Sequence, residues 1–353
     1  MSTEVWTVDS LLGALWDAGG TDLHLSAMSR PLIRVHMDLI PLAGTEVMKP
    51  AEIERLAREL LTDEQLDDCR RGHDVDFSFG WRGQARIRGN AYRQRNTVAL
   101  ALRIMPHTIP SFDDLGIPMS VRELAAADQG LILVTGPTGS GKSTTLATML
   151  DWIAANRAVH IITIEDPIEY VHSHQKAAVH QRAVGEDTES FAAALRSALR
   201  EDPDVILVGE LRDLESIRFA LTLAETGHLV LATVHTNDTA QTMDRLVEVF
   251  PGDEQSQIRT QLALSLKAVV YQRLLPRRGG GLVAAYEVLK NNSSIRNLIK
   301  EGRTNQLRNQ LIMGRKEGMM SLEDSLSDLV QKGLVDYEQA AIRSQHPNEV
   351  AKG

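Results

Sequence analysis

In the first third of the chain, apolar residues recur at helical spacing in some segments and alternate with polar residues in others. Val8, Leu11, Leu12 and Leu15 recur at helical spacing, which predicts an amphipathic helix over residues 5–17. A charged stretch predicts a second helix over residues 50–70. Alternating positions predict strands at residues 22–26, 31–35, 75–79, 85–92 and 97–104. Helices combined with an antiparallel hairpin predict a small α+β domain that ends near residue 110.

A different pattern follows further along the chain. Short apolar runs predict buried strands at residues 131–135, 159–164, 205–208 and 229–234, and helical periodicity predicts helices from residue 142, over 188–200 and over 213–225. Apolar strands separated by helices predict an α/β fold with a parallel sheet covered on both faces. From residue 253 onward we expect only helices. Ser321-x-x-Asp324 resembles a capping box at the start of one of them, and Gly333 is a stop signal.

Turn-forming residues separate the two patterned regions. Residues 109–118 contain prolines, a glycine and aspartates, which is typical of a linker. The 353 residues suit two or three domains. We therefore expect an N-terminal domain over residues 1–110, a linker over 111–120, an α/β core over 121–252 and a helical region over 253–353.

The clearest chemical signal lies where the first buried strand of the core ends. Gly136-x-x-x-x-Gly141-Lys142-Ser143 has the spacing of a complete phosphate-binding loop. Its glycines let backbone N–H groups surround an anion, and the helix that follows directs its positive end at the same charge. Lys142 would reach the β- and γ-phosphates, and the Ser143 hydroxyl would bind Mg²⁺. A glycine turn with an unrelated lysine is the alternative. Strand, motif and helix start agree, however, and predict a nucleoside triphosphate site formed by Gly136, Pro137, Thr138, Gly139, Ser140, Gly141, Lys142, Ser143 and Thr144.

Other strands of the core end in side chains suited to phosphoryl transfer. Transfer to water needs charge neutralisation, a positioned water and a proton acceptor. Glu210 follows a buried strand and is our candidate for activating water, with capping of the next helix as the alternative. Glu165, Asp166 and Glu169 follow another strand and could hold Mg²⁺ through water. We favour Glu165, because Asp166 precedes a proline and is equally a turn former. His235 ends a further strand and could sense the γ-phosphate, although a lone histidine is usually structural.

Composition narrows the function classes. The formal charge of −9 and the pI near 5.7 argue against a general nucleic-acid binder, which usually has a basic footprint. The single cysteine, Cys69, excludes an internal disulfide framework and a multi-cysteine zinc site, and we expect it to be an inert thiol. We expect no transmembrane segment, because no apolar run approaches the roughly 18 residues of a membrane helix. The N-terminus lacks the basic region of a signal peptide, so we expect a cytoplasmic protein.

Four segments together resemble the signature boxes of secretion-superfamily ATPases. They are residues 136–146, 164–170, 198–213 and 226–236. Within that superfamily the chain is similar to the type IV pilus retraction ATPases, and the likeness extends from Ser26 to Asp336. The resemblance implies a PAS-like N-terminal domain, a RecA-like core and a homohexameric ring with nucleotide at domain and subunit junctions.

The resemblance also assigns roles to individual residues. It places Glu165, Asp166 and Glu169 in the acidic box, Glu210 as the catalytic glutamate, and His228 and His235 in the histidine box. It gives arginines of the N-terminal hairpin a role as charge-neutralising fingers, and Arg88 and Arg103 align best. A solvated basic face on an edge sheet is the alternative for these arginines. Arg196 and Arg200 are secondary candidates, at i, i+4 spacing on the polar face of their helix.

Residues 294–301 resemble the hallmark helix of the retraction subfamily. Its members here are Ser294, Ile295, Arg296, Asn297, Leu298, Ile299, Lys300 and Glu301, with Ser294 in place of alanine and Lys300 in place of arginine. The apolar members recur at i, i+3 and i+4, so they should dock the helix and leave Arg296 available to a partner. A merely solvated polar face is the alternative.

The function implied by the resemblance is that of a motor. ATP hydrolysis with Mg²⁺ would drive pilus disassembly and retraction, and thus twitching motility, from the inner face of the cytoplasmic membrane. The expected partners are an inner-membrane pilus platform protein and, as a further candidate, a second pilus ATPase. Two alternatives stay open: an assembly or secretion ATPase of the same superfamily, and a weakly hydrolysing accessory subunit. Assembly and secretion ATPases usually carry a longer N-terminal region and a four-cysteine zinc module, which this sequence lacks.

Overall fold

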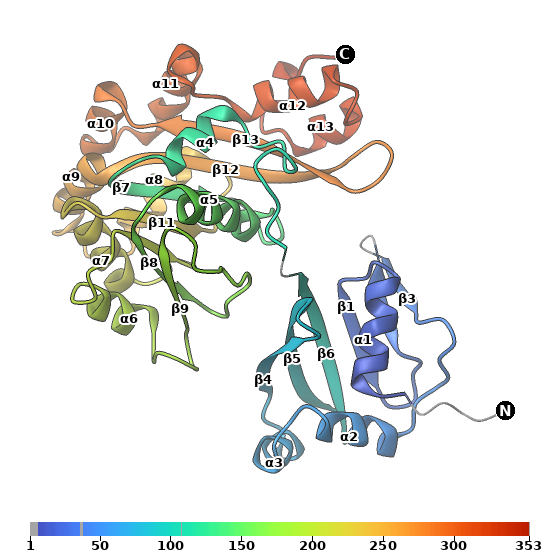
Figure 1. Cartoon of the computed structure of the whole chain (residues 1–353). Coiled ribbons are helices and arrows are strands. Elements are labelled where there is room, and N and C mark those ends of the chain that lie inside the picture. The colour runs from blue at the N-terminus through green and yellow to red at the C-terminus, as the bar shows by residue number, and fades with distance from the viewer. Residues whose placement is uncertain (1–5, 36–37, 107, 353) are drawn as a thin grey trace. The chain divides into compact units, whose positions relative to one another are not determined.

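A computed structural model describes residues 6–35, 38–106 and 108–352 (Figure 1). The chain divides into two compact units, Met1–Thr108 and Ile109–Gly353. Among the described residues, no helix combines the length and the apolar character that crossing a bilayer requires.

The first unit is built on a six-stranded antiparallel sheet with the order β3-β2-β1-β6-β5-β4. Its strands are β1 (Asp22–Ser26), β2 (Leu32–Val35), β3 (Asp38–Pro41), β4 (Val75–Trp81), β5 (Ala85–Gln94) and β6 (Thr97–Pro106), and its helices are α1 (Val8–Asp17), α2 (Pro50–Arg58) and α3 (Asp63–Arg71). Leu11, Leu12 and Leu15 of α1 are fully buried in one cluster with apolar side chains of α2, α3 and the sheet. Cys69 lies in the same core, where burial raises the pKa of its thiol, as expected of an inert thiol.

The helix predicted over residues 50–70 is wrong as a single element. Two helices occupy this stretch, because Thr62 starts a new one with a capping box. The Thr62 hydroxyl accepts a hydrogen bond from the Gln65 backbone N–H at 3.3 Å, and the Gln65 side chain accepts one from the Thr62 N–H at 3.0 Å. Strand β3, at the edge of the sheet, was not predicted.

The second unit is built on a seven-stranded sheet with the order β13-β12-β7-β11-β10-β8-β9. Its strands are β7 (Gly130–Thr135), β8 (His160–Glu165), β9 (Ala178–Ala183), β10 (Val205–Val208), β11 (Leu229–Val234), β12 (Leu266–Pro276) and β13 (Leu282–Lys290). All neighbours pair in parallel except β12 and β13, which form an antiparallel hairpin. The predicted parallel sheet is confirmed for the four strands that the sequence identified.

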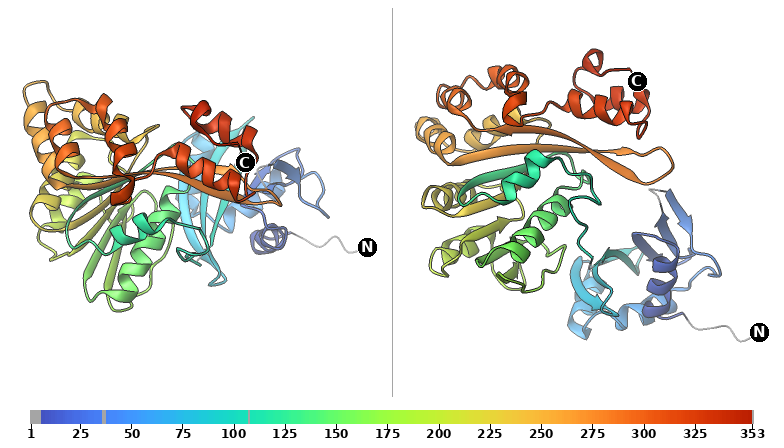
Figure 2. Two further views of the ribbon diagram at one scale, coloured as in Figure 1. Left: turned by 90° about the horizontal axis from the view of Figure 1, so that it is seen from above. Right: turned by 45° about the horizontal axis from the view of Figure 1, so that its top comes forward.

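Helices cover both faces of this sheet (Figures 1 and 2). They are α4 (Met119–Ala125), α5 (Lys142–Asn156), α6 (Phe191–Ala198), α7 (Leu214–Glu225), α8 (Thr239–Glu248), α9 (Gln255–Ser265), α10 (Ser293–Lys300), α11 (Leu307–Met313), α12 (Leu322–Gln331) and α13 (Tyr337–Arg343), with short 3₁₀ segments at Thr304–Gln306, Gly314–Glu317 and Pro347–Glu349. Helices α4 and α5 pack in one cluster, α6–α11 in a second, and α12 and α13 against the hairpin in a third. Ser321 caps α12, as its sequence predicted, by accepting a hydrogen bond from the Asp324 N–H at 3.1 Å.

The expectation of a purely helical chain after residue 253 is wrong for residues 266–290. This segment forms β12 and β13, and β12 pairs in parallel with β7, the strand that leads into the phosphate-binding loop. Most of β12 is buried, so its apolar run has no alternating pattern to distinguish it from a buried helix. The core sheet therefore extends beyond the boundary that the sequence suggested.

Candidate active site

The phosphate-binding loop and three polar strand ends meet at one edge of the core sheet. The register places Thr135 of β7 beside Val234 of β11, Ala232 beside Val208 of β10, and Val208 beside Ile164 of β8. Because these strands are parallel, the segments that follow them emerge at the same edge. The fold thus brings together the loop, Glu165, Glu210 and His235.

The loop needs its glycines because of the strand beside it. Gly136 has a φ of +143°, and a Cβ there would overlap the carbonyl oxygen of Gln272 in β12. Gly141 has a φ of +87°, and a Cβ there would lie 2.8 Å from the Gln272 amide nitrogen. Thr138 and Gly139 are exposed, whereas the Ser140 hydroxyl is buried and has no hydrogen-bond partner among the described residues. A hydroxyl left unpaired inside an anion-binding loop fits a phosphate oxygen as its partner.

Lys142 is buried under the loop at the start of α5. Its ammonium donates hydrogen bonds to the carbonyl oxygens of Gly136 and Pro137, both at 3.0 Å. Burial lowers the pKa of Lys142, and the nearby carboxylates of Glu210 and Glu169 oppose that shift. The lysine is held by weak neutral acceptors, so a phosphate can compete for it.

His235 bridges the lysine and the candidate catalytic carboxylate. Its Nδ1 lies 3.5 Å from the Lys142 ammonium, and its Nε2 lies 3.4 Å from a carboxylate oxygen of Glu210. An ammonium only donates, so the tautomer with its proton on Nε2 fits both contacts. Glu210 also pairs with Arg212 at 2.6 Å, which raises the pKa of the Arg212 guanidinium. Glu210 is therefore fixed from two sides, next to the group that would bind phosphate.

Ser143, Glu165 and Glu169 line a small cavity of about 30 Å³ beside the loop. One Glu165 oxygen accepts hydrogen bonds from the Thr163 hydroxyl at 2.6 Å and the Gln181 amide at 3.1 Å. Burial raises the pKa of the Glu165 carboxyl. Among the residues that the structure describes, no three acidic, histidine or cysteine side chains are arranged to hold a metal. One hydroxyl and one carboxylate still fit Mg²⁺, which binds few protein ligands and keeps several waters.

A larger cavity of about 390 Å³ opens on the other side of the loop. Its lining combines Gly141, Thr144 and Thr145 with the linker residues 113–116 and side chains of the β12–β13 hairpin. The Thr145 hydroxyl donates to the Gln272 side-chain oxygen at 2.7 Å, and both residues are buried. This cavity is large enough for a nucleoside next to the phosphate position.

The arginines predicted as fingers lie on adjacent strands of the first unit. Arg88 in β5 pairs in register with Arg103 in β6, and both line a cavity of about 260 Å³ with Asp22 and His24. Arg103 is held by Asp22 through a 2.7 Å ion pair. Arg88 is exposed, and within the described part of the chain no hydrogen bond or ion pair engages its guanidinium.

Several other candidates lie away from the loop or are already engaged. His228 precedes β11, at the opposite end of that strand from His235, and its ring contacts the Leu223 carbonyl at 3.0 Å. Arg196 pairs with Glu215 and lies 5.7 Å from the Phe219 ring, and Arg200 is exposed beyond α6. Asp166 is exposed, and its charge acts on Arg212. The structure does not bring His228, Arg196 or Arg200 to the phosphate-binding loop.

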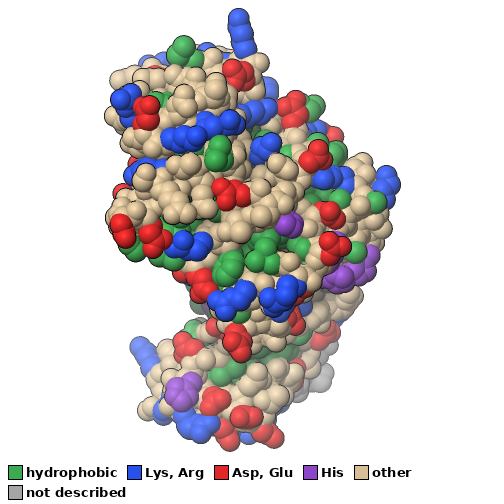
Figure 3. Space-filling view, turned by 90° about the vertical axis from the view of Figure 1, so that its left-hand side faces the viewer, with side chains coloured by type: hydrophobic (Ala, Val, Ile, Leu, Met, Phe, Trp, Pro, Cys, Tyr) green, Lys and Arg blue, Asp and Glu red, His purple; other side chains and the backbone are tan. Residues whose placement is uncertain are grey.

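The hallmark segment forms α10, as its spacing predicts. Ile295 and Ile299 are fully buried, Leu298 packs partly on the same cluster, and the helix lies against α9. Asn297, Lys300 and Glu301 are exposed, and Arg296 is half-buried with an unpaired Nε. Acidic and basic side chains lie intermingled on the side of the molecule shown in Figure 3. The docking face of α10 is confirmed, while a partner for its polar face stays a prediction.

Sequence reasoning missed three residues that contact the site or its neighbours. Gln272 backs the loop, Arg212 holds Glu210, and Tyr170 contacts the Thr144 hydroxyl at 3.0 Å. Arg212 and Tyr170 lie inside the motif segments, where their neighbours were already candidates. No local signal marks Gln272, because only the pairing of β12 with β7 brings it to the loop.

The fold and these contacts define a P-loop ATPase: a parallel sheet, a complete phosphate loop, and a carboxylate and a histidine at the same edge. Comparison with known proteins gives the family. The model of the family "Type II/IV secretion system protein" matches residues 74–345. The chain belongs to this family of secretion ATPases.

Individual relatives point to one branch of the family. The type IV pilus retraction ATPase PilT of Pseudomonas aeruginosa is 44% identical over 340 residues, which cover 96% of this chain and 98% of the relative. A twitching motility protein of Neisseria gonorrhoeae is 44% identical over 92% of this chain and 87% of its own length. A crystal structure of the pilus retraction motor PilT with bound ADP superposes with a TM-score of 0.89 at 45% identity and covers 98% of both chains.

Proposed function

We propose that this chain is a motor subunit that hydrolyses ATP to drive disassembly and retraction of a type IV pilus. The observation that carries the proposal is the bridge formed by Lys142, His235 and Glu210 at the edge of the core sheet. It joins a group that binds phosphate to a carboxylate that can act on water. Similarity to the retraction ATPases over nearly the whole chain supplies the process that the hydrolysis serves.

The residues divide the chemistry of hydrolysis among them. The loop amides and Lys142 bind the β- and γ-phosphates, and the cavity beside Gly141 and Thr145 takes the nucleoside. Ser143 and Glu165 would hold Mg²⁺, directly or through water, and the ion would neutralise charge on the phosphates. Glu210 orients the attacking water and accepts its proton. His235 contacts both Glu210 and Lys142, so it can sense whether a γ-phosphate lies between them.

Arg88 is our choice for the finger that completes the site. Among the described residues no hydrogen bond or ion pair engages its guanidinium, whereas Arg103 would have to leave Asp22. An arginine that reaches the γ-phosphate is worth about 10³–10⁵ in rate. We propose that a ring of six subunits brings Arg88 to nucleotide, and that the ring works at the cytoplasmic face of the inner membrane on a platform protein.

Turnover and retraction measured together test the function. The purified chain should hydrolyse ATP with Mg²⁺, and Glu210→Gln should not. Expression in cells that lack their own retraction ATPase should restore twitching. Turnover without restored retraction would favour the assembly or secretion alternative. Retraction that needs a second ATPase, with little turnover by the chain alone, would favour the accessory subunit.

Mixed rings test the finger separately. Subunits with Arg88→Ala keep Glu210, and subunits with Glu210→Gln keep Arg88, so mixing them should create some intact sites. We expect the mixture to exceed the sum of the two parents. Arg30→Ala, at an exposed arginine between β1 and β2, is the matched control and should behave as wild type. A mixture that never exceeds its parents would remove Arg88 as a finger supplied by a neighbour.

A further inference from the structure

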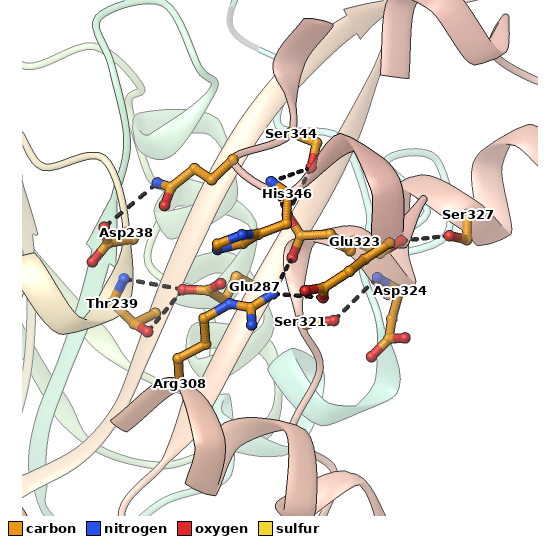
Figure 4. A network of polar contacts seen from close by, with 12 residues as sticks. Asp238, Thr239, Glu287, Arg308, Ser321, Glu323, Asp324, Ser327, Ser344 and His346 are labelled. Atoms are coloured by element: carbon orange, nitrogen blue, oxygen red, sulfur yellow. Dashed lines mark hydrogen bonds and ion pairs between the residues drawn. The ribbon is translucent and has the colours of Figure 1, made fainter. Parts of the chain in front are cut away.

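A second polar network lies beyond the loop that follows His235 (Figure 4). It surrounds a cavity of about 180 Å³ whose lining includes Asp238, Thr239, Glu287, Arg308, Glu323 and Gln345. Two of its carboxylates, Glu287 and Glu323, are only 8% and 4% exposed. Burying a carboxylate is costly unless its hydrogen bonds are specific, so the partners of these two groups indicate what the network does.

Glu287 of β13 holds the start of α8. One of its oxygens accepts hydrogen bonds from the Thr239 backbone N–H at 3.0 Å and from the Thr239 hydroxyl at 2.8 Å. Thr239 is four residues after His235 and is itself buried. The loop of residues 236–238 therefore connects His235 at the phosphate site to a residue anchored on the hairpin, and α8 also holds this loop through a 2.7 Å contact between the Thr236 and Thr242 hydroxyls.

Glu323 of α12 holds the C-terminal segment in the same way. One of its oxygens accepts from the Ser344 hydroxyl at 2.7 Å and from the His346 N–H at 3.3 Å, and the other lies 3.6 Å from Arg308 of α11. Between these two anchored residues, Gln345 reaches back to the loop. Its amide donates to the Asn237 carbonyl at 2.8 Å and lies 3.4 Å from an Asp238 carboxylate oxygen.

Building on the function proposed above, we propose that Gln345 and Glu287 are positioning residues for His235. They fix the loop after His235 from two sides, so the contact between this histidine and the γ-phosphate depends on how the C-terminal segment is docked on α12. The same contacts act in reverse, because coupling between two sites is reciprocal. Binding of ATP rather than ADP therefore alters the hold on the C-terminal segment.

A double-mutant cycle on nucleotide preference tests this inference. The quantity measured is the ratio of affinities for a non-hydrolysable ATP analogue and for ADP, with Mg²⁺, in the full chain. Loss of one hydrogen bond is worth about 0.5–1.5 kcal/mol, so Gln345→Ala should lower the preference roughly two- to tenfold. It should have no further effect when His235→Ala is already present, because it acts through that residue.

Matched variants separate positioning from a merely structural role. Gln345 and Gln331 are both exposed, and Gln331 ends α12 away from the loop, so Gln331→Ala should leave the ratio unchanged. Thr239→Val removes a donor to Glu287 and should lower the preference, whereas Thr239→Ser keeps the donor and should restore it. Equal effects of Gln345→Ala with and without His235, or no effect at all, would overturn the inference. The test measures nucleotide binding, so its outcome does not depend on hydrolysis. If the wild-type chain does not hydrolyse ATP, that result refutes the proposed function and leaves this inference untouched.

Discussion

Replacing Thr145 with valine should destabilise the contact between α5 and β12 that supports the phosphate-binding loop. Thr145 lies in the first turn of α5 and is fully buried, and its hydroxyl donates to the Gln272 side chain at 2.7 Å. Gln272 is 3% exposed. Its backbone carbonyl packs against Gly136, and its side-chain amide packs against Gly141. Valine has nearly the same shape as threonine but has no donor. The side-chain oxygen of Gln272 would then be buried without a partner.

The size of the effect follows from that buried oxygen. Leaving a buried acceptor unpaired costs about 1–3 kcal/mol of unfolding free energy. For a unit the size of residues 109–353, each kcal/mol shifts the melting temperature by about 2–4 °C. We therefore expect the transition of this unit to fall by roughly 2–12 °C. Nucleotide affinity should fall as well, because Gln272 sets the position of two loop glycines.

Thermal unfolding and nucleotide titration of three variants check this reasoning. Thr145→Ser keeps the hydroxyl and should melt above Thr145→Val. In the double variant Thr145→Val with Gln272→Leu, both polar partners are replaced by apolar groups, which should recover much of the lost stability. If Thr145→Val is as stable as Thr145→Ser, or if the double variant is less stable than either single change, the hydrogen bond between Thr145 and Gln272 does not stabilise the contact of α5 with β12.

Three further predictions concern the site, the second network and α10. Lys142→Ala should abolish nucleotide binding, whereas Glu210→Gln should bind ATP normally and lose at least about a hundredfold in turnover. Nucleotide titration and phosphate release distinguish the two variants. Near-normal turnover in Glu210→Gln would remove Glu210 from the mechanism. Burial raises the pKa of Glu287 in the folded protein above its ordinary 4.5, so the contribution of this residue to the free energy of unfolding should fall as pH rises above 4.5. Glu287→Gln should therefore make the melting temperature depend less on pH, which thermal unfolding at several pH values measures. An unchanged pH profile would contradict this prediction. Arg296→Ala should keep most ATP turnover and abolish retraction; parallel loss of both would make α10 a structural element of the ring.

Local patterns sufficed to predict the parts of the site that lie next to one another in the sequence. The loop from Gly136 to Ser143 needs only a strand, a glycine turn and a helix start, and all three are contiguous. Glu165, Glu210 and His235 could be placed beside it because each ends an apolar strand of a parallel sheet. Topology converted separate sequence signals into one site, and the structure does bring these residues together.

The hairpin of β12 and β13 shows where such reasoning fails. Ala268 to Tyr271 are all buried, so β12 has no alternation, and helix α9 runs into it at Leu266 without a turn residue between them. Only long-range pairing makes this segment a strand: β12 lies beside β7, more than a hundred residues earlier in the chain. The consequences for function are direct, because this pairing delivers Gln272 to the loop, and its partner strand carries Glu287 to the start of α8. The same hairpin thus contacts both the phosphate-binding loop and the segment that follows His235. Movement of β12 and β13 relative to β7 would change the phosphate loop and the His235 loop together, which gives the helices packed on the hairpin a physical route to the nucleotide.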